Sequence, residues 1–172
     1  LLPAGPLREP LKEIERADRI VLVNKGEYSQ QAGGKFNRIS GWLKKEFEKE
    51  ALLCTLENSR VYSLTTGEIK SGIERALVFS GIGQPDGFFS SVKKLGIELV
   101  LEKTYCDHYQ YTQEDVQEIL FEAQKLSVDA VITTEKDAVK LKPILDRLED
   151  SVPLCALKLK VNLDMENLLG EV

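Results

Sequence analysis

The spacing of hydrophobic positions becomes regular from residue 75 onward. Short apolar runs such as RALVF and DAVITT are typical of buried strands, and they alternate with segments whose apolar residues recur every three or four positions. The predicted strands are 75–79, 97–105, 129–134 and 152–161, and the predicted helices are 85–96, 112–127 and 137–149. This alternation predicts βαβ units, and therefore an α/β fold with a mainly parallel sheet flanked by helices (Rossmann-like).

The first 74 residues are patterned less regularly. LLPAGPLREP holds three prolines and is expected to be an extended entry segment before a helix that starts at Pro10. The elements expected after it are a buried strand at 19–23, a loop at 24–34, an amphipathic helix at 35–49, and two short strands around ENSR within 51–70. We divide the chain into an entry segment with its first helix, 1–18, and an α/β domain, 19–172.

Three loops follow directly after predicted strands, and they carry the polar residues of interest. Their sequences are SGIGQPDG, CDHYQY and TTEKD. The carboxyl ends of parallel strands meet at one edge of a sheet, where open α/β folds place their ligands. The sequence therefore predicts that these three loops form a common rim.

His108 is the only histidine of the chain and lies in the second of these loops. An imidazole titrates near neutral pH, so it can serve as a general base. It can equally be a loop residue with a satisfied hydrogen bond, and the sequence leaves both interpretations open. Thr112 and Asp115 have the spacing of a capping box, which would fix the chain just after His108. Asp107 is the nearest acid, but on an extended backbone adjacent side chains point to opposite sides.

The other two loops offer weaker candidates. Gly81 and Gly83 belong to a GxGxxxG pattern that favours a tight turn over a phosphate cradle. Lys136 and Asp137 lie near a predicted helix start, where Asp137 complements the helix dipole. Lys136 is long enough to contact a phosphate, but a solvated lysine or a structural ion pair is the favoured interpretation.

The helix at 35–49 carries basic residues beside Trp42, which is compatible with contact to anionic lipid. A core-packed helix with a solvated basic face is the favoured alternative. The basic residues are Lys35, Arg38, Lys44, Lys45 and Lys49.

Composition excludes several classes of protein. The net charge of -5 argues against a general nucleic-acid binder, which needs a basic surface. With one histidine and three widely separated cysteines, no structural metal site is expected. No apolar run reaches the roughly 18 residues of a membrane span. Because the first residue is leucine, we expect the chain to be part of a longer protein.

Four motifs in this order, LLPAGPLREP, FSGIGQPDGFF, DHYQYT and TTEKDAVKL, closely resemble the C-terminal half of the tetraacyldisaccharide 4'-kinase (lipid A 4'-kinase) family. The resemblance covers essentially the whole chain. It implies transfer of the ATP γ-phosphate to the 4'-hydroxyl of tetraacyldisaccharide 1-phosphate, giving lipid IVA, with Mg²⁺ as a cofactor. It also implies a peripheral protein on the cytoplasmic face of the bacterial inner membrane. The implied fold is two α/β domains joined by a short two-stranded linker, with the active site between them.

The resemblance also implies roles for individual residues. His108 matches a histidine that pairs with an aspartate in a catalytic dyad. Arg8 and Glu9 match a charged pair near the substrate, and on its own chemistry Arg8 would suit a phosphate. Gly81, Gly83, Lys136 and Asp137 match positions without an assigned catalytic role.

The sequence departs from the family pattern in ways that matter for activity. Cys106 replaces the usual proline, and the P-loop, the magnesium-binding acids and the aspartate of the dyad belong to the half that this chain does not include. We expect the substrate side of a kinase, inactive by itself. Two alternatives remain, a stand-alone Rossmann-like binding module and a small enzyme that uses His108 alone.

Overall fold

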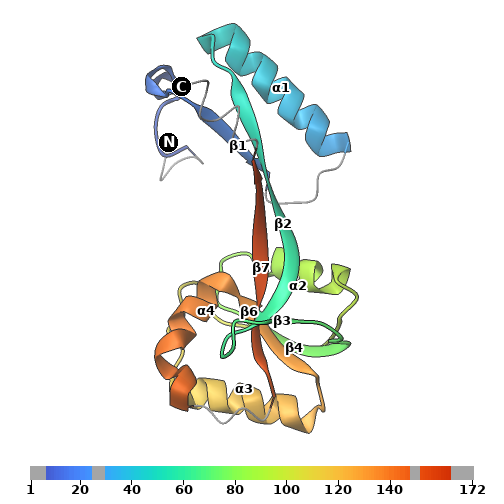
Figure 1. The fold of residues 1–172 in the computed structure, drawn as a ribbon. Helices are drawn as coiled ribbons and strands as arrows, with labels where there is room; N and C mark the ends of the chain where they lie inside the picture. The colour runs from blue at the N-terminus through green and yellow to red at the C-terminus, as the bar shows by residue number, and fades with distance from the viewer. Residues whose placement is uncertain (1–6, 25–29, 148–151, 164–172) are drawn as a thin grey trace. The chain divides into compact units, whose positions relative to one another are not determined.

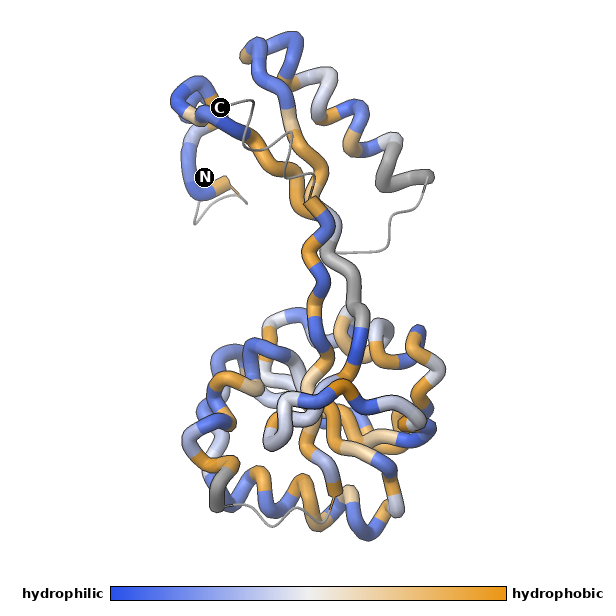
Figure 2. The backbone as a smooth tube through the Cα atoms, in the orientation of Figure 1, coloured by the Kyte–Doolittle hydropathy of each residue, from blue (hydrophilic) through white to orange (hydrophobic). Residues whose placement is uncertain are grey.

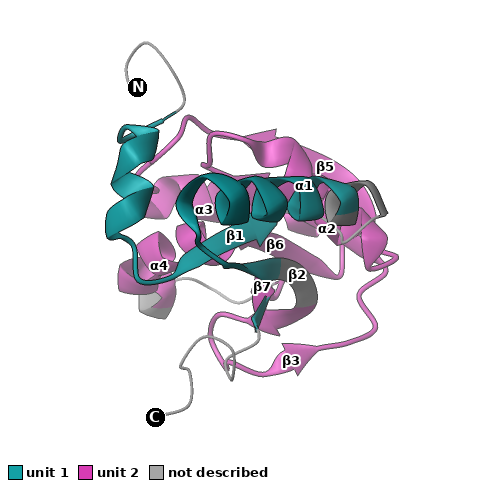
Figure 3. Ribbon diagram, turned by 90° about the horizontal axis from the view of Figure 1, so that it is seen from above, with its two compact units in different colours: residues 1–57, 161–172 teal, residues 58–160 magenta. Residues whose placement is uncertain are grey.

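The computed structural model describes residues 7–24, 30–147 and 152–163. Within them the chain divides into two compact units (Figure 3). Unit 1 comprises residues 1–57 and 161–172, and unit 2 comprises residues 58–160. The chain passes from one unit to the other within two strands, β2 (Ala51–Ser63) and β7 (Leu154–Leu163). The division at residues 18 and 19 expected from the sequence stays a prediction about the domains of a longer protein.

Unit 1 contains a parallel strand pair and one long helix (Figure 1). A 3-10 helix, η1 (Leu11–Arg16), precedes β1 (Ile20–Asn24), which pairs with β2 from Ile20↔Ala51 to Asn24↔Thr55. Helix α1 (Gln30–Phe47) buries Leu43, and this bears out the predicted amphipathic helix. One expectation fails here. The strand predicted to be buried, β1, alternates half-buried with exposed side chains, as in a strand covered on one face.

Two element boundaries also differ from those predicted. Helix α1 starts at Gln30, inside the stretch predicted to be loop, because each of its glycines costs a helix only about 1 kcal/mol relative to alanine. The segment ENSR does not reverse the chain; β2 runs through it without a break. The reversal comes at Gly67, whose φ of 73° suits glycine, and β3 (Ile69–Lys70) then pairs antiparallel with the end of β2.

Unit 2 holds the regular α/β pattern predicted from the sequence. Its elements are β4 (Arg75–Ser80), α2 (Pro85–Lys94), β5 (Glu98–Thr104), α3 (Gln113–Lys125), β6 (Ala130–Thr134), α4 (Glu135–Leu141), the 3-10 helix η2 (Lys142–Arg147) and β7. The strand order is β7–β6–β4–β5, and all three of these pairings are parallel. The mainly parallel, Rossmann-like α/β class is therefore confirmed.

The core of unit 2 lies on both faces of this sheet. Along β4, Ala76 and Val78 pack on the side of α2, with Phe88. The intervening Leu77 and Phe79 pack on the other side. Their partners there include Val116, Ile119 and Leu120 of α3. Figure 2 shows hydrophobic residues concentrated in these central strands. Because both faces are covered, every position in the interior of β4 is apolar, and its polar residues, Arg75 and Ser80, stand at its two ends.

Candidate functional site

The carboxyl ends of β4, β5 and β6 carry three loops that contact one another, as the sequence predicts. Gly81 of the first loop donates its backbone N–H to Asp137, which follows β6, at 2.9 Å. Its carbonyl accepts the N–H of His108 in the second loop at 3.2 Å. Lys136 of the third loop contacts Asp107 of the second at 3.2 Å. These five residues, Gly81, Asp107, His108, Lys136 and Asp137, are called the rim cluster below.

Asp137 is the buried member of the rim cluster, with no exposed surface. Its Oδ2 accepts the Gly81 N–H and the Thr134 hydroxyl, the latter at 2.8 Å. Its Oδ1 pairs with the Lys140 ammonium at 2.8 Å, and its N–H donates to Thr134 Oγ1, which caps α4. Asp137 therefore does more than complement a helix dipole, because it ties the start of α4 to the end of β4.

Gly81 is required by close packing at this point. A Cβ atom on Gly81 would lie 2.9 Å from the Tyr111 hydroxyl and 3.1 Å from Cβ of Tyr109. A Cβ atom on Gly83 would lie 3.4 Å from Asp107 Oδ2, an ordinary contact. Gly81 thus serves a tight crossing of loops, which agrees with the turn interpretation of the GxGxxxG pattern.

Asp107 and Lys136 form a half-exposed ion pair at the rim. Asp107 Oδ1 lies 3.2 Å from Lys136 Nζ, so Lys136 is a structural ion-pair residue, as the favoured interpretation held. This hydrogen bond, assisted by the charge of His108, holds the pKa of Asp107 below its ordinary range despite some desolvation. A carboxylate at this position is therefore ionised near neutral pH.

His108 is an exposed loop residue with an unusual backbone. Its side chain is 74% exposed, and its φ is 62°, in the left-handed region that few non-glycine residues adopt. This turn corrects the expectation that Asp107 and His108 point to opposite sides. Asp107 Oδ2 lies 3.7 Å from Nε2 of His108, close enough for charge interaction but longer than a hydrogen bond.

A cluster of tyrosines supports the His108 loop, and sequence analysis missed it. The rings of Tyr105, Tyr109 and Tyr111 contact one another, with centroids 4.7 to 5.2 Å apart, and Tyr111 also meets Phe79 at 5.3 Å. Burial raises the pKa of Tyr105 to about 12 and that of Tyr111 further still, so both stay neutral. The alternation YQY after DH was the signal for two inward-facing rings.

The capping box predicted just after this loop is present. Thr112 Oγ1 accepts the Asp115 N–H at 3.1 Å, and Asp115 Oδ2 accepts the Thr112 N–H at 2.8 Å. Asp115 also accepts the Tyr109 hydroxyl at 3.2 Å. The loop that carries His108 is therefore fixed at its far end by the start of α3.

The remaining sequence candidates lie in unit 1. Arg8 and Glu9 are exposed residues ahead of η1, and the structure does not test their predicted substrate contacts. Lys44 of α1 pairs with Glu50 at 2.7 Å, and Lys49, which follows the end of α1, donates to the Ala17 carbonyl at 2.9 Å. On α1, Leu43 is buried and the neighbouring Lys44 is exposed, as in a packed helix with a solvated basic face, and lipid contact stays a prediction.

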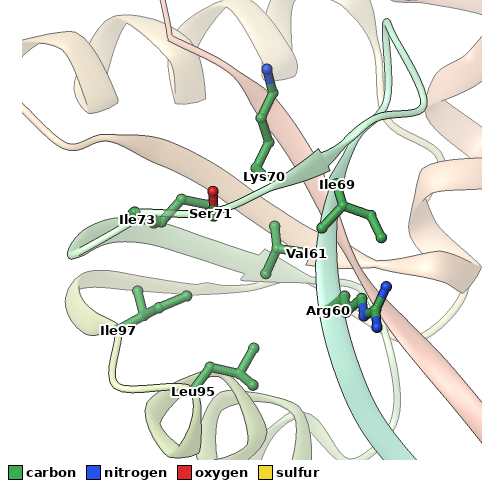
Figure 4. Close-up of a pocket in the computed structure, with 9 residues that line it drawn as sticks. Arg60, Val61, Ile69, Lys70, Ser71, Ile73, Leu95 and Ile97 are labelled. Carbon is green, nitrogen blue, oxygen red and sulfur yellow. The ribbon is translucent and has the colours of Figure 1, made fainter.

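Two small cavities lie elsewhere. One of about 550 Å³ in unit 1 is bordered mainly by charged residues, including the Lys44–Glu50 pair. The other, of about 200 Å³, lies in unit 2 beside Ile73 and Ile97, which precede β4 and β5 at the opposite edge of the sheet from His108. In Figure 4 the Lys70 side chain points away from Leu95 and Ile97, two of the apolar residues that line this cavity.

Across residues 7–24, 30–147 and 152–163, no group of three or more His, Cys, Asp or Glu side chains is placed to hold a metal ion. Of the helices described, none combines the length and the apolar character that crossing a bilayer requires.

Comparisons with known proteins agree on one family. The family model described as tetraacyldisaccharide-1-P 4'-kinase matches residues 1–172. Proteins named tetraacyldisaccharide 4'-kinase are similar to this chain. That of Chelativorans sp. is 31% identical over 95% of the chain, and that of Rhodospirillum rubrum is 34% identical over 83%. The chain spans 44% and 39% of the length of these two relatives.

A solved structure is similar as well. The crystal structure of LpxK from Aquifex aeolicus in complex with ATP aligns with 98% of this chain, at 30% sequence identity and a TM-score of 0.59. The chain covers 45% of that protein.

Proposed function

The chain belongs to the tetraacyldisaccharide-1-P 4'-kinase family, and on that premise we propose that it is the substrate-side part of a kinase. The kinase would transfer the γ-phosphate of ATP to the 4'-hydroxyl of tetraacyldisaccharide 1-phosphate, giving lipid IVA. Because the chain spans less than half of its relatives, the activity is proposed for a longer protein of which it forms part.

The observation that carries this proposal is the presentation of His108. The one imidazole of the chain lies at the carboxyl edge of a parallel sheet, exposed to solvent, on a loop fixed by backbone contacts to Gly81 and by the capping box of α3. Open α/β sheets bind their ligands at this edge. We assign to His108 the role of proton acceptor for the attacking hydroxyl.

The chemistry of the reaction suits this role. A hydroxyl that attacks phosphorus loses its proton as the new O–P bond forms, and a neutral imidazole can accept that proton near pH 7. The family resemblance implies an aspartate partner on the other half of the protein, and Asp107 adds a second carboxylate 3.7 Å from Nε2. A nearby carboxylate stabilises the imidazolium that forms.

The residues of this chain do not fit ATP or Mg²⁺. The sequence contains no GxxxxGK[ST] loop, and the described residues provide no metal-binding group of acids. We propose that both cofactors bind mainly to residues outside this chain, and no step is derived through them. When bound, they supply the phosphoryl donor and the charge that stabilises it.

Arg8 and Glu9 are proposed to contact the lipid disaccharide. An arginine can hold a phosphate or carboxylate through two parallel hydrogen bonds, which lysine cannot reproduce. In the full-length protein, Arg8→Ala should weaken use of the lipid substrate, and Arg8→Lys should restore it only in part. Unchanged kinetics in both variants would remove Arg8 from the substrate site. Because the proposed substrate is a lipid, we also propose that the longer protein attaches peripherally to the cytoplasmic face of the inner membrane.

Substitution of His108 tests the proposed function. In the full-length protein, His108→Ala should lower kcat by about 10²- to 10⁴-fold, with little change in KM, because a general base is lost. His108→Asn should lose as much, although asparagine tolerates the left-handed backbone. Gln117→Ala, an exposed position on α3, is the control and should stay active. Full activity of both His108 variants would contradict the role of His108 as proton acceptor. A binding module without a catalytic residue would then be the better interpretation of unit 2.

A further inference from the structure

Lys136 has no part in the proposed proton transfer, yet it contacts the residue beside His108. We infer that Lys136 is a positioning residue, which holds Asp107 so that one carboxylate oxygen faces the imidazole of His108. The inference rests on the proposed function, in which His108 accepts the proton. Lys136 and Asp107 belong to two motifs that lie apart in the sequence, TTEKD and DHYQYT.

The two carboxylate oxygens of Asp107 have different partners. Oδ1 accepts hydrogen bonds from Lys136 Nζ at 3.2 Å and from the backbone N–H of His108 at 3.0 Å. Oδ2 accepts neither of them and lies 3.7 Å from Nε2 of His108. Because two donors fix Oδ1, the plane of the carboxylate is set, and Oδ2 is kept toward the ring.

Lys136 is itself fixed by its neighbour in the sequence. Asp137 is fully buried and bonded to the Gly81 N–H, and the Gly81 carbonyl accepts the His108 N–H. Helix α4 therefore reaches His108 by two routes. One runs through Asp137 and Gly81 to the His108 backbone, and the other runs through Lys136 to Asp107 beside the ring.

The charges around Asp107 make Lys136 the cation that balances it. The β4–α2 loop contributes Gly81 and Gly83, which carry no charge. On α4, the charges of Asp137 and Lys140 are paired with each other. The remaining titratable side chains of its own loop are Tyr105, Cys106, His108, Tyr109 and Tyr111.

The ion pair of Lys136 and Asp107 is a poor source of stability. Both side chains are about half exposed, at 48% and 46%, and exposed pairs add little to folding because water and salt screen them. The effect that we assign to this ion pair is therefore to hold the carboxylate of Asp107 beside the ring of His108.

The placement can be tested on the 172-residue chain by NMR, without substrate. The chain has one histidine, so the imidazole ring gives a single set of signals. Lys136→Met and Asp107→Asn should both move these signals, whereas Lys136→Arg should keep them near their original positions, because arginine retains the charge and the donors. Lys136→Met should also raise the pKa of the Asp107 carboxyl. Lys142→Met, the same change on an exposed lysine later in the chain, is the control. Ring signals unaffected by Lys136→Met would overturn the inference.

Kinetics of the full-length protein test its consequence. Lys136→Met should lower kcat about 10- to 100-fold with KM unchanged, the loss expected when a reacting group is misplaced. Lys136→Arg should recover most of the rate. Asp107→Asn should match Lys136→Met, and the double variant should be no slower than either, because the two residues act as a unit.

Two other outcomes would contradict the inference in different ways. A raised KM, or losses that multiply in the double variant, would show that Lys136 contacts the substrate directly. Full activity of His108→Ala would overturn the proposed function, while the NMR experiment would still decide whether Lys136 places Asp107 beside the ring.

Discussion

Asp137 and Glu50 each form an ion pair with a lysine, Asp137 with Lys140 at 2.8 Å and Glu50 with Lys44 at 2.7 Å. Although the distances are nearly equal, we expect very different consequences when each acid is removed. The side chains of Lys140 and Asp137 are 13% and 0% exposed, whereas those of Lys44 and Glu50 are 62% and 83% exposed. Asp137→Ala would leave the ammonium of Lys140, on a mostly buried side chain, without its partner. Glu50→Ala would leave an ammonium that water solvates.

The expected loss for Asp137→Ala is about 3 to 5 kcal/mol of unfolding free energy, the range found when one partner of a buried pair is removed. The Gly81 N–H, which loses its acceptor, accounts for about 1 to 3 kcal/mol of this. These figures overlap, because both describe the loss of one carboxylate. Asp137→Asn keeps an acceptor for Gly81 and should fall between the alanine variant and the parent.

Urea unfolding provides the assay. Near-UV circular dichroism of the tyrosine cluster reports on unit 2, and fluorescence of Trp42, on α1, reports on unit 1. Asp137→Ala should move the tyrosine transition to lower urea, and Glu50→Ala should leave both transitions in place. Adding Lys140→Met to Asp137→Asn should recover stability, because no buried charge is then left unpaired. A loss below about 1 kcal/mol for Asp137→Ala would refute the reasoning, since a solvated pair would behave in that way.

Three further predictions follow from local contacts. Gly81→Ala should destabilise unit 2 by about 1 to 3 kcal/mol in the same assay, because the added Cβ would lie 2.9 Å from the Tyr111 hydroxyl; an unchanged midpoint would contradict this packing. Thr112→Ala should cost about 1 kcal/mol, since it removes the cap of α3, and a neutral result would show that the cap adds nothing. The backbone N–H groups of Arg75 and Glu74 hold the pKa of Asp129 below its ordinary range. The Asp129 carboxylate therefore stabilises the fold at pH values above its unfolded pKa of about 3.9, and this stabilisation is lost as the pH falls through its pKa in the folded protein. Asp129→Asn should therefore flatten the acid side of the stability–pH curve, and an unaltered curve would exclude this role.

The helices with local start signals were predictable, and the buried polar contacts were not. The spacing of Thr112 and Asp115 predicts the start of α3, and the structure contains that capping box. Thr134 and Asp137 have the same spacing, but the predicted helix began at 137, so Asp137 was taken for a first-turn acid. Its burial depends on Gly81, 56 residues away in the sequence. No local pattern carries a contact of that range.

The backbone at His108 was the second feature beyond the sequence. Alternation of side chains was assumed for Asp107 and His108, as in a strand, but β5 ends at Thr104 and the chain turns. A positive φ at a residue other than glycine arises from its surroundings, here the bond to the Gly81 carbonyl. The rim itself was predictable, since it follows from the alternation of parallel strands and helices.

The path of the chain through β2 and β7 has a consequence for how such a protein can be assembled in evolution. Residues 58–160 are bounded on both sides by residues of unit 1, and the two strands that cross these borders, β2 and β7, are neighbours in the sheet. Two segments far apart in the gene thus lie side by side. A segment whose ends adjoin can be inserted, exchanged or deleted as a cassette, because a short splice reconnects the host chain. The coding segment for unit 2 could in this way be replaced as a whole. Recombination at its two borders would allow a different domain to be inserted between β2 and β7 of the host chain.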